Sequence, residues 1–71
     1  MNEVQMWVLL KVRERPATAG GLIAAANGVL FLKSQTSWRK VDRAIQFLRR
    51  AELIRFNGRK WHATAKGRIG A

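Results

Sequence analysis

The chain has 71 residues, 48% of them hydrophobic, and carries 14 Lys and Arg against 4 Asp and Glu, a net charge of +10. This length predicts one small domain with a thin core, and so apolar a composition excludes an intrinsically disordered chain. The sequence has no cysteine, which excludes disulfides and thiolate–metal sites, and no uninterrupted apolar run of about 18 residues, which excludes a membrane span.

The positive charge is concentrated in the second half of the chain. Residues 1–32 carry three basic and two acidic side chains, whereas residues 33–71 carry eleven and two. Because a folded domain this basic repels itself, a polyanionic partner would stabilise it. Nucleic acid is the favoured partner, and an anionic membrane surface is the alternative.

Residues 2–15 predict a first helix, with Asn2 as its N-cap and Gln5 three residues later. Its apolar side chains cover more than one face, so a strand over residues 8–12 is an alternative. Pro16 ends the segment, because it pushes the preceding residue out of the helical region. A helix that is apolar nearly all round is expected to pack against its own domain and against a second subunit. Burial in the centre of a single small core is the competing interpretation.

A second helix is predicted over residues 19–27, with Thr18 as its cap. Three positions have the spacing of a core-facing stripe: Leu22, Ile23 and Ala26. The pair Asn27-Gly28 suits a left-handed stop at the end of this helix. Within residues 29–36, the apolar run over residues 29–32 predicts either a short buried strand or an apolar linker.

The clearest helical pattern spans residues 37–51, with a hydroxyl cap from Ser37 or Thr36. Its apolar stripe recurs at i, i+3, i+4 and i+7: Val41, Ala44, Ile45 and Leu48. At about 100° per residue, the opposite side collects four polar residues: Arg39, Arg43, Gln46 and Arg50. In a domain this basic, such a face favours a binding surface over an ordinary solvated face.

Residues 53–56 and 59–63 predict two strands joined by Asn57-Gly58, the pair that favours a two-residue type I′ turn. Such a turn implies two cross-strand pairs: Ile54 with Trp61, and Phe56 with Arg59. Ile54 and Trp61 then share the buried face of the hairpin. The other face carries Arg55, Lys60 and His62.

The order helix, helix, longer helix, hairpin resembles a winged helix-turn-helix domain. That is a mostly helical α+β fold with three helices and a C-terminal β-hairpin wing, here one domain over residues 1–71. Residues 41–54, Val-Asp-Arg-Ala-Ile-Gln-Phe-Leu-Arg-Arg-Ala-Glu-Leu-Ile, resemble the recognition-helix exit of many bacterial winged-helix regulators, in which a Gly-Leu-Ile step leads into the wing. Residues 63–68, Ala-Thr-Ala-Lys-Gly-Arg, are similar to the Leu-Thr-x-Lys-Gly-Arg segment that follows the wing in MarR-like proteins. Thr64 is suited to cap a last short turn over residues 65–69.

Three features differ from the family pattern. Glu52 stands where the family usually has Gly, and the link over residues 28–36 is longer than the usual tight turn. The sequence also ends soon after the wing, without the long C-terminal helix through which MarR-like regulators dimerise. We therefore expect a homodimer to form through residues 2–15.

The resemblance implies that the helix over residues 37–51 enters the major groove of double-stranded DNA. Base contacts are expected from Arg39, Arg43 and Gln46, because a guanidinium bridges guanine O6 and N7 and a glutamine pairs with adenine. Contacts with the DNA backbone, or from the wing, are expected from Ser37, Trp38, Lys40, Arg50, Arg55, Arg59 and Lys60. Lys33 and Arg49 are further candidates for phosphate contacts.

The large aromatic residues have two expected places. Trp7, Phe31 and Trp61 are predicted in the core, which a domain this small needs large side chains to fill. Trp38 either packs under the third helix or stacks on a sugar or an exposed base.

These features predict a small sequence-specific transcriptional regulator in the cytoplasm, at the nucleoid of a bacterial or phage-infected cell, and a phage or mobile element would suit such a protein. The alternatives are a nonspecific or structural nucleic-acid binder, RNA included, and a domain whose basic face meets an acidic protein. No enzyme, cofactor, metal or small-molecule effector is predicted, because His62 is the only histidine and the four acids are scattered along the sequence.

Overall fold

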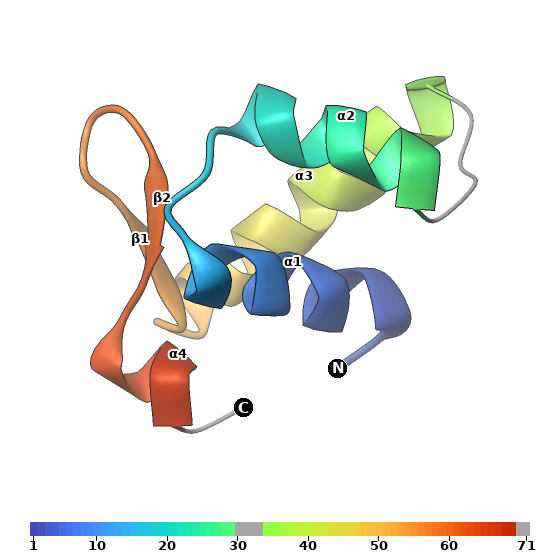
Figure 1. Ribbon diagram of the computed structural model, residues 1–71. Helices are drawn as coiled ribbons and strands as arrows, with labels where there is room; N and C mark the ends of the chain where they lie inside the picture. The colour runs from blue at the N-terminus through green and yellow to red at the C-terminus, as the bar shows by residue number, and fades with distance from the viewer. Residues whose placement is uncertain (30–33, 70–71) are drawn as a thin grey trace.

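The computed structural model describes residues 1–29 and 34–69 (Figure 1). The elements, in chain order, are α1 (Glu3–Glu14), α2 (Ala19–Val29), α3 (Ser34–Arg50), β1 (Ile54–Phe56), β2 (Trp61–Ala63) and α4 (Ala65–Ile69). Three helices followed by a two-stranded antiparallel hairpin form the α+β winged-helix layout predicted from the sequence.

α1 begins with the predicted capping box. The Asn2 side chain accepts a hydrogen bond from the Gln5 backbone N–H at 2.8 Å, and the Gln5 side chain accepts one from the Asn2 N–H at 3.0 Å. The helix ends where Pro16 predicted, because Arg15 is extended with φ −162° and ψ 152°. The alternative strand over residues 8–12 is therefore wrong.

α1 buries one face within the domain and exposes another. Val8, Leu9 and Val12 are buried, whereas the Leu10 side chain is 47% exposed. The inner side of α1 is thus buried by its own domain. The predicted contact with a second subunit would have to use the outer side.

α2 starts at its predicted cap but runs further than predicted. The Thr18 hydroxyl accepts a hydrogen bond from the Gly21 N–H at 3.0 Å, and Leu22 and Ala26 are buried. The predicted stop at Asn27-Gly28 is wrong, since both residues lie inside the helix without a left-handed φ. α2 packs along α3, and this packing outweighs a local helix-breaking preference of about 1 kcal/mol.

α3 begins at Ser34, three residues before the predicted start. Ser37 and Thr36 therefore lie inside the helix, and the prediction that either one caps it is wrong. A hydroxyl residue costs only a few tenths of a kcal/mol inside a helix, so it marks a start only weakly. Of the segment left open over residues 29–36, residues 30–33 lie outside the described part of the chain.

α3 ends in a Schellman motif that uses Glu52 in place of glycine. Glu52 has φ 63°, its N–H donates to the Arg49 carbonyl at 3.0 Å, and the Leu53 N–H donates to the Leu48 carbonyl at 2.9 Å. The buried Leu48 and Leu53 supply the apolar pair typical of this motif. The exit that the family makes with Gly is therefore made here by a strained residue.

The hairpin has a four-residue connection, not the predicted two-residue turn. The register pairs Ile54 with Ala63, Arg55 with His62 and Phe56 with Trp61. The Asn57 side chain explains the difference, because its Oδ1 accepts hydrogen bonds from the backbone N–H groups of Arg59 and Lys60 at 2.9 and 2.8 Å. The predicted pairing is therefore wrong by two residues, a shift that leaves every strand side chain on its predicted face.

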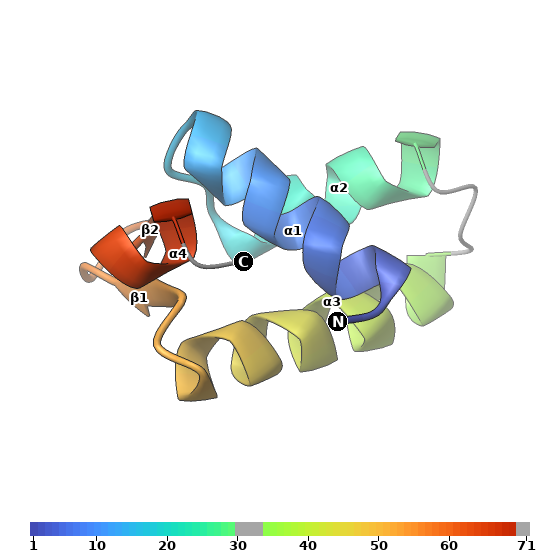
Figure 2. The ribbon, with the colours of Figure 1, turned by 90° about the horizontal axis from the view of Figure 1, so that it is seen from below.

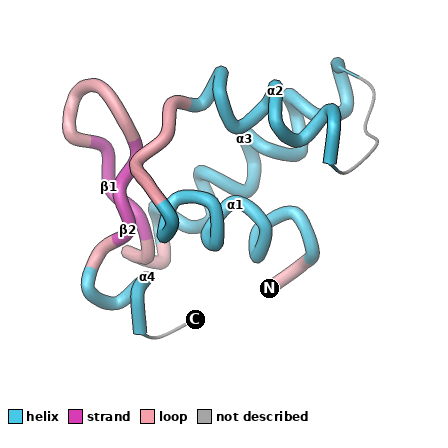
Figure 3. The backbone as a smooth tube through the Cα atoms, viewed as in Figure 1, coloured by secondary structure: helices cyan, strands magenta, loops and turns pink. Residues whose placement is uncertain are grey.

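A third extended segment joins the hairpin. Ala17 pairs with Trp61 through two backbone hydrogen bonds of 3.1 and 2.7 Å, on the side of β2 away from β1. This pairing ties the α1–α2 connection to the hairpin (Figure 3). In the sequence, only Pro16 indicates extended backbone near Ala17, because a proline disfavours the helical conformation of the residue before it.

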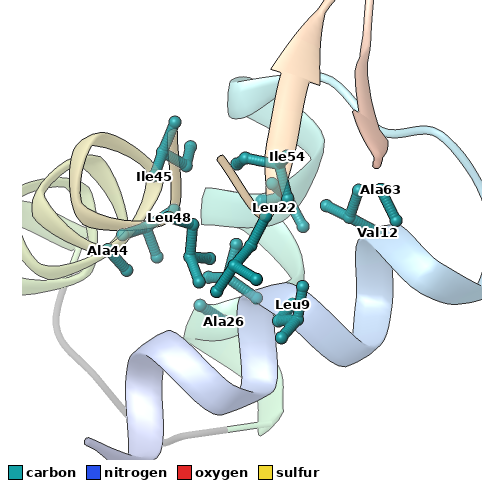
Figure 4. Close-up of a cluster of buried hydrophobic side chains, with 12 residues drawn as sticks. Leu9, Val12, Leu22, Ala26, Ala44, Ile45, Leu48, Ile54 and Ala63 are labelled. Atoms are coloured by element: carbon teal, nitrogen blue, oxygen red, sulfur yellow. The ribbon is translucent and has the colours of Figure 1, made fainter. Parts of the chain in front are cut away.

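The core lies where the helices and the hairpin meet (Figure 4). Its buried side chains come from α1, α2, α3 and both strands, and they include Leu9, Leu22, Ile45, Leu48, Ile54 and Ala63. Val41, Ala44, Ile45 and Leu48 are all buried, so the predicted inner stripe of α3 is confirmed. This burial fixes which side of α3 faces outward.

Candidate nucleic-acid interface

The outer face of α3 is built by its sequence spacing. α1 and α2 lie on one side of α3, and no described element covers the other side (Figure 2). Arg39, Arg43 and Arg50 are exposed and Gln46 is half-buried on that outer side. The structure therefore brings the four predicted polar residues onto one accessible face.

The α3 arginines are not neutralised by acids of the described chain. The one salt bridge within residues 1–29 and 34–69 joins Lys11 to Glu14 at 3.7 Å, away from α3. Asp42 is exposed and forms no ion pair with an arginine described by the structure. The positive charge of α3 is thus available to an outside anion.

The hairpin and the C-terminal half of α3 border an open groove of about 1000 Å³. We call it the wing groove and define it by six of its lining residues: Gln46, Arg49, Arg55, Phe56, Arg59 and Trp61. On its α3 side, Arg49 Nη1 donates a hydrogen bond to Gln46 Oε1 at 3.2 Å. Ala19, the first residue of α2, also lines the groove.

The wing groove has an aromatic floor. The Phe56 and Trp61 rings lie 5.1 Å apart at an angle of 49°, and the Phe56 side chain is 51% exposed. Trp61 is half-buried and packs against the core, so its predicted core position is confirmed only in part. Sequence reasoning missed this floor, because the predicted register placed Phe56 opposite Arg59.

A second, smaller hollow of about 380 Å³ lies on the other side of α3. Lys40 and Arg43 line it together with the N-terminal residues of α1. Within the outer face of α3, Gln46 borders the wing groove and Arg43 borders the α1 side, so these two predicted base-contacting residues lie toward opposite edges of that face.

The remaining candidates are distributed around these two hollows. Trp38 is 57% exposed, so it does not pack under α3. Lys60 is exposed in the hairpin loop, beyond the residues that line the wing groove. The Ser37 side chain, Lys33 and Phe31 lie outside the part of the chain whose side chains the structure describes.

The described residues hold no cluster of side chains that could bind a metal ion. No group of three His, Cys, Asp or Glu side chains comes together within them. The His62 Nε2 atom is buried and has no hydrogen-bond partner among these residues. Among the helices that the structure describes, none has the length and apolar character needed to cross a membrane.

No protein-family model matches this chain, and comparisons with curated proteins and with solved structures find no match either. The resemblance to MarR-like regulators therefore stays a prediction.

Proposed function

We propose that this protein binds double-stranded DNA in a sequence-specific manner, as a small transcriptional regulator. In this proposal α3 enters the major groove and the β1–β2 hairpin acts as the wing, as in the MarR-like regulators that the sequence resembles. Such a protein would act in the cytoplasm, at the nucleoid.

One observation carries this proposal: α3 exposes Arg39, Arg43 and Arg50 on the side opposite its buried stripe. An α-helix is about 10–12 Å wide with its side chains, which fits a major groove of about 12 Å. Because the inner stripe clamps α3 to the body of the domain, the arginines are presented on a rigid support.

The two halves of this face have different proposed roles. Arg39 and Arg43 have the fork-shaped donor group that recognises guanine, and the Gln46 amide suits adenine. Arg50, near the C-terminal end of α3, suits a phosphate, as do Lys40, Arg55, Arg59 and Lys60. If six to eight phosphates are neutralised, affinity falls by about three orders of magnitude between 50 and 200 mM salt.

Selection from a random duplex library, at about 150 mM salt, tests the proposal directly. We expect an enriched motif, and Arg43→Ala should relax the preference at one or two positions of that motif. Arg15→Ala removes the same charge from an exposed residue outside α3 and is the matched control. An unchanged preference in the Arg43→Ala variant, with all affinities lowered alike, would favour the nonspecific alternative, RNA included. Negligible duplex binding would contradict the proposal.

We also propose that two copies pair through the outer side of α1, which would give a two-fold symmetric motif in this selection. Leu10, which is 47% exposed, is the large apolar residue that α1 leaves exposed.

A further inference from the structure

The wing groove contains an aromatic pair, Phe56 and Trp61, that the proposed duplex binding does not use. A single exposed phenylalanine needs no explanation on a protein surface. Phe56, however, lies against Trp61 at the floor of a hollow, and three of the residues that line this hollow are arginines. An apolar face with cationic edges is the combination that binds an unstacked base and its phosphates.

The charges of the groove are open to a ligand. Arg49, Arg55 and Arg59 are exposed, and none forms a salt bridge with an acid of the described chain. Glu52 is the single acid among the lining residues, so the groove stays net positive. The hydrogen bond from Arg49 to Gln46 is to a neutral amide and leaves the arginine charge uncompensated.

The shape of the groove argues for a chain-like ligand. Small-molecule sites typically enclose most of their ligand, whereas this groove is open along α3 and the hairpin. A base pair inside a duplex is stacked on both faces, so it offers no free face to Phe56. An acidic peptide would satisfy the arginines but would make no use of the aromatic floor.

We propose that the wing groove binds a single-stranded segment of nucleic acid. One base stacks on Phe56, beside Trp61, and Arg49 and Arg59 bind the adjacent phosphates. This site shares Gln46 and Arg59 with the proposed duplex binding but goes beyond it, because it uses Phe56 and Trp61 and does not use Arg39 or Arg43. The two activities are therefore separable by mutation.

The test measures the affinity of the full chain for a fluorescent single-stranded DNA of about 12 nucleotides and mixed sequence. Phe56→Ala should lower this affinity about 5- to 100-fold, since it removes the stacking surface. Phe56→Leu should lose most of the same affinity, because leucine keeps apolar bulk without an aromatic face. Phe47→Ala, which changes a 43% exposed phenylalanine outside the groove, is the matched control and should bind like the parent.

Two further measurements separate this proposal from duplex binding by α3 and from binding of an acidic peptide. Arg39→Ala should leave single-strand affinity within about twofold while it weakens duplex binding, and Phe56→Leu should do the reverse. A poly-glutamate peptide of equal charge should compete poorly.

The proposal is overturned by any of four results: no single-strand binding, parental affinity in both Phe56 variants, an equal loss in the Phe47 variant, or equal competition by the peptide. None of these results decides the duplex selection, in which the Arg43→Ala variant tests base recognition by α3.

Discussion

Gly67 lies against the backbone carbonyl of Leu53, so closely that a Cβ at position 67 would stand 1.9 Å from the carbonyl oxygen. The Gly67 carbonyl also accepts a hydrogen bond from Arg13 Nε, and the Gly67 N–H donates to the Thr64 hydroxyl at 3.0 Å. One glycine therefore joins α4 to α1 and to the exit of α3.

Gly67→Ala should destabilise the domain by about 1–3 kcal/mol, because the added methyl group meets backbone that cannot move freely. Urea unfolding followed by tryptophan fluorescence measures this loss. Gly20→Ala is the control, since a Cβ there meets nothing within 4 Å. It should be neutral or stabilise by up to about 1 kcal/mol. Equal stability of the Gly67→Ala variant and the parent would contradict this packing.

The Gly67 segment illustrates what sequence could and could not predict. The resemblance of residues 63–68 to a post-wing segment was visible, but the contact with Leu53 joins residues 14 positions apart and has no local signature. Helical spacing predicted which residues of α3 are buried and which face outward, because the apolar stripe of an amphipathic helix packs against the core. The Asn2 cap of α1 was predictable for a similar reason, since it depends on residues within one turn.

The errors arose where one side chain or a distant contact decided the outcome. The Asn-Gly pair suggested a two-residue turn, but the Asn57 side chain accepts from the Arg59 and Lys60 N–H groups and the Asn57 N–H donates to the Lys60 carbonyl at 3.1 Å, which makes the connection four residues long. The wing groove depends in turn on the hairpin register, because it places Phe56 beside Trp61. A sequence pattern could supply the arginines of the site but not its aromatic floor.

Glu52→Gly should stabilise the domain, because Glu52 has φ 63° and a residue with a Cβ is strained in that region. The Glu52→Ala variant separates the backbone effect from the charge, since it also removes the carboxylate from the C-terminal end of α3. The free energy of unfolding, measured in urea, should be about 1 kcal/mol larger for the Glu52→Gly variant than for the Glu52→Ala variant. Two variants of equal stability would show that the left-handed conformation is not maintained.

Asn57→Ala should destabilise the hairpin by about 1 kcal/mol, because two backbone N–H groups lose their acceptor. Asn57→Asp keeps an acceptor oxygen and should retain most of the stability. Amide hydrogen exchange at Arg59 and Lys60 reports the change locally and should rise in the alanine variant alone. Unchanged exchange at both positions in the alanine variant would contradict the two hydrogen bonds to the Asn57 side chain.

The proposed pairing of two copies predicts a concentration-dependent dimer in sedimentation equilibrium. Leu10→Glu should shift it to monomer without unfolding the domain, because Leu10 is 47% exposed in the single chain. Phe47→Glu places the same charge on an exposed apolar position of α3 and should leave the association unchanged. A parent protein that sediments as a monomer up to high concentration would rule out the α1 interface and leave the DNA-binding proposal untouched.

Lys60 tests whether the hairpin acts as a wing. It is exposed in the loop of the hairpin, and a lysine on a phosphate adds affinity without sequence information. Lys60→Ala should therefore weaken binding to all duplex sequences by a similar factor, and it should reduce the slope of log K against log salt by about 1. Lys66→Ala removes the same charge from exposed α4 and should change neither quantity. An unaltered salt slope for Lys60→Ala would mean that α3 binds DNA without the hairpin, and the proposed docking would then have to turn the hairpin away from the duplex.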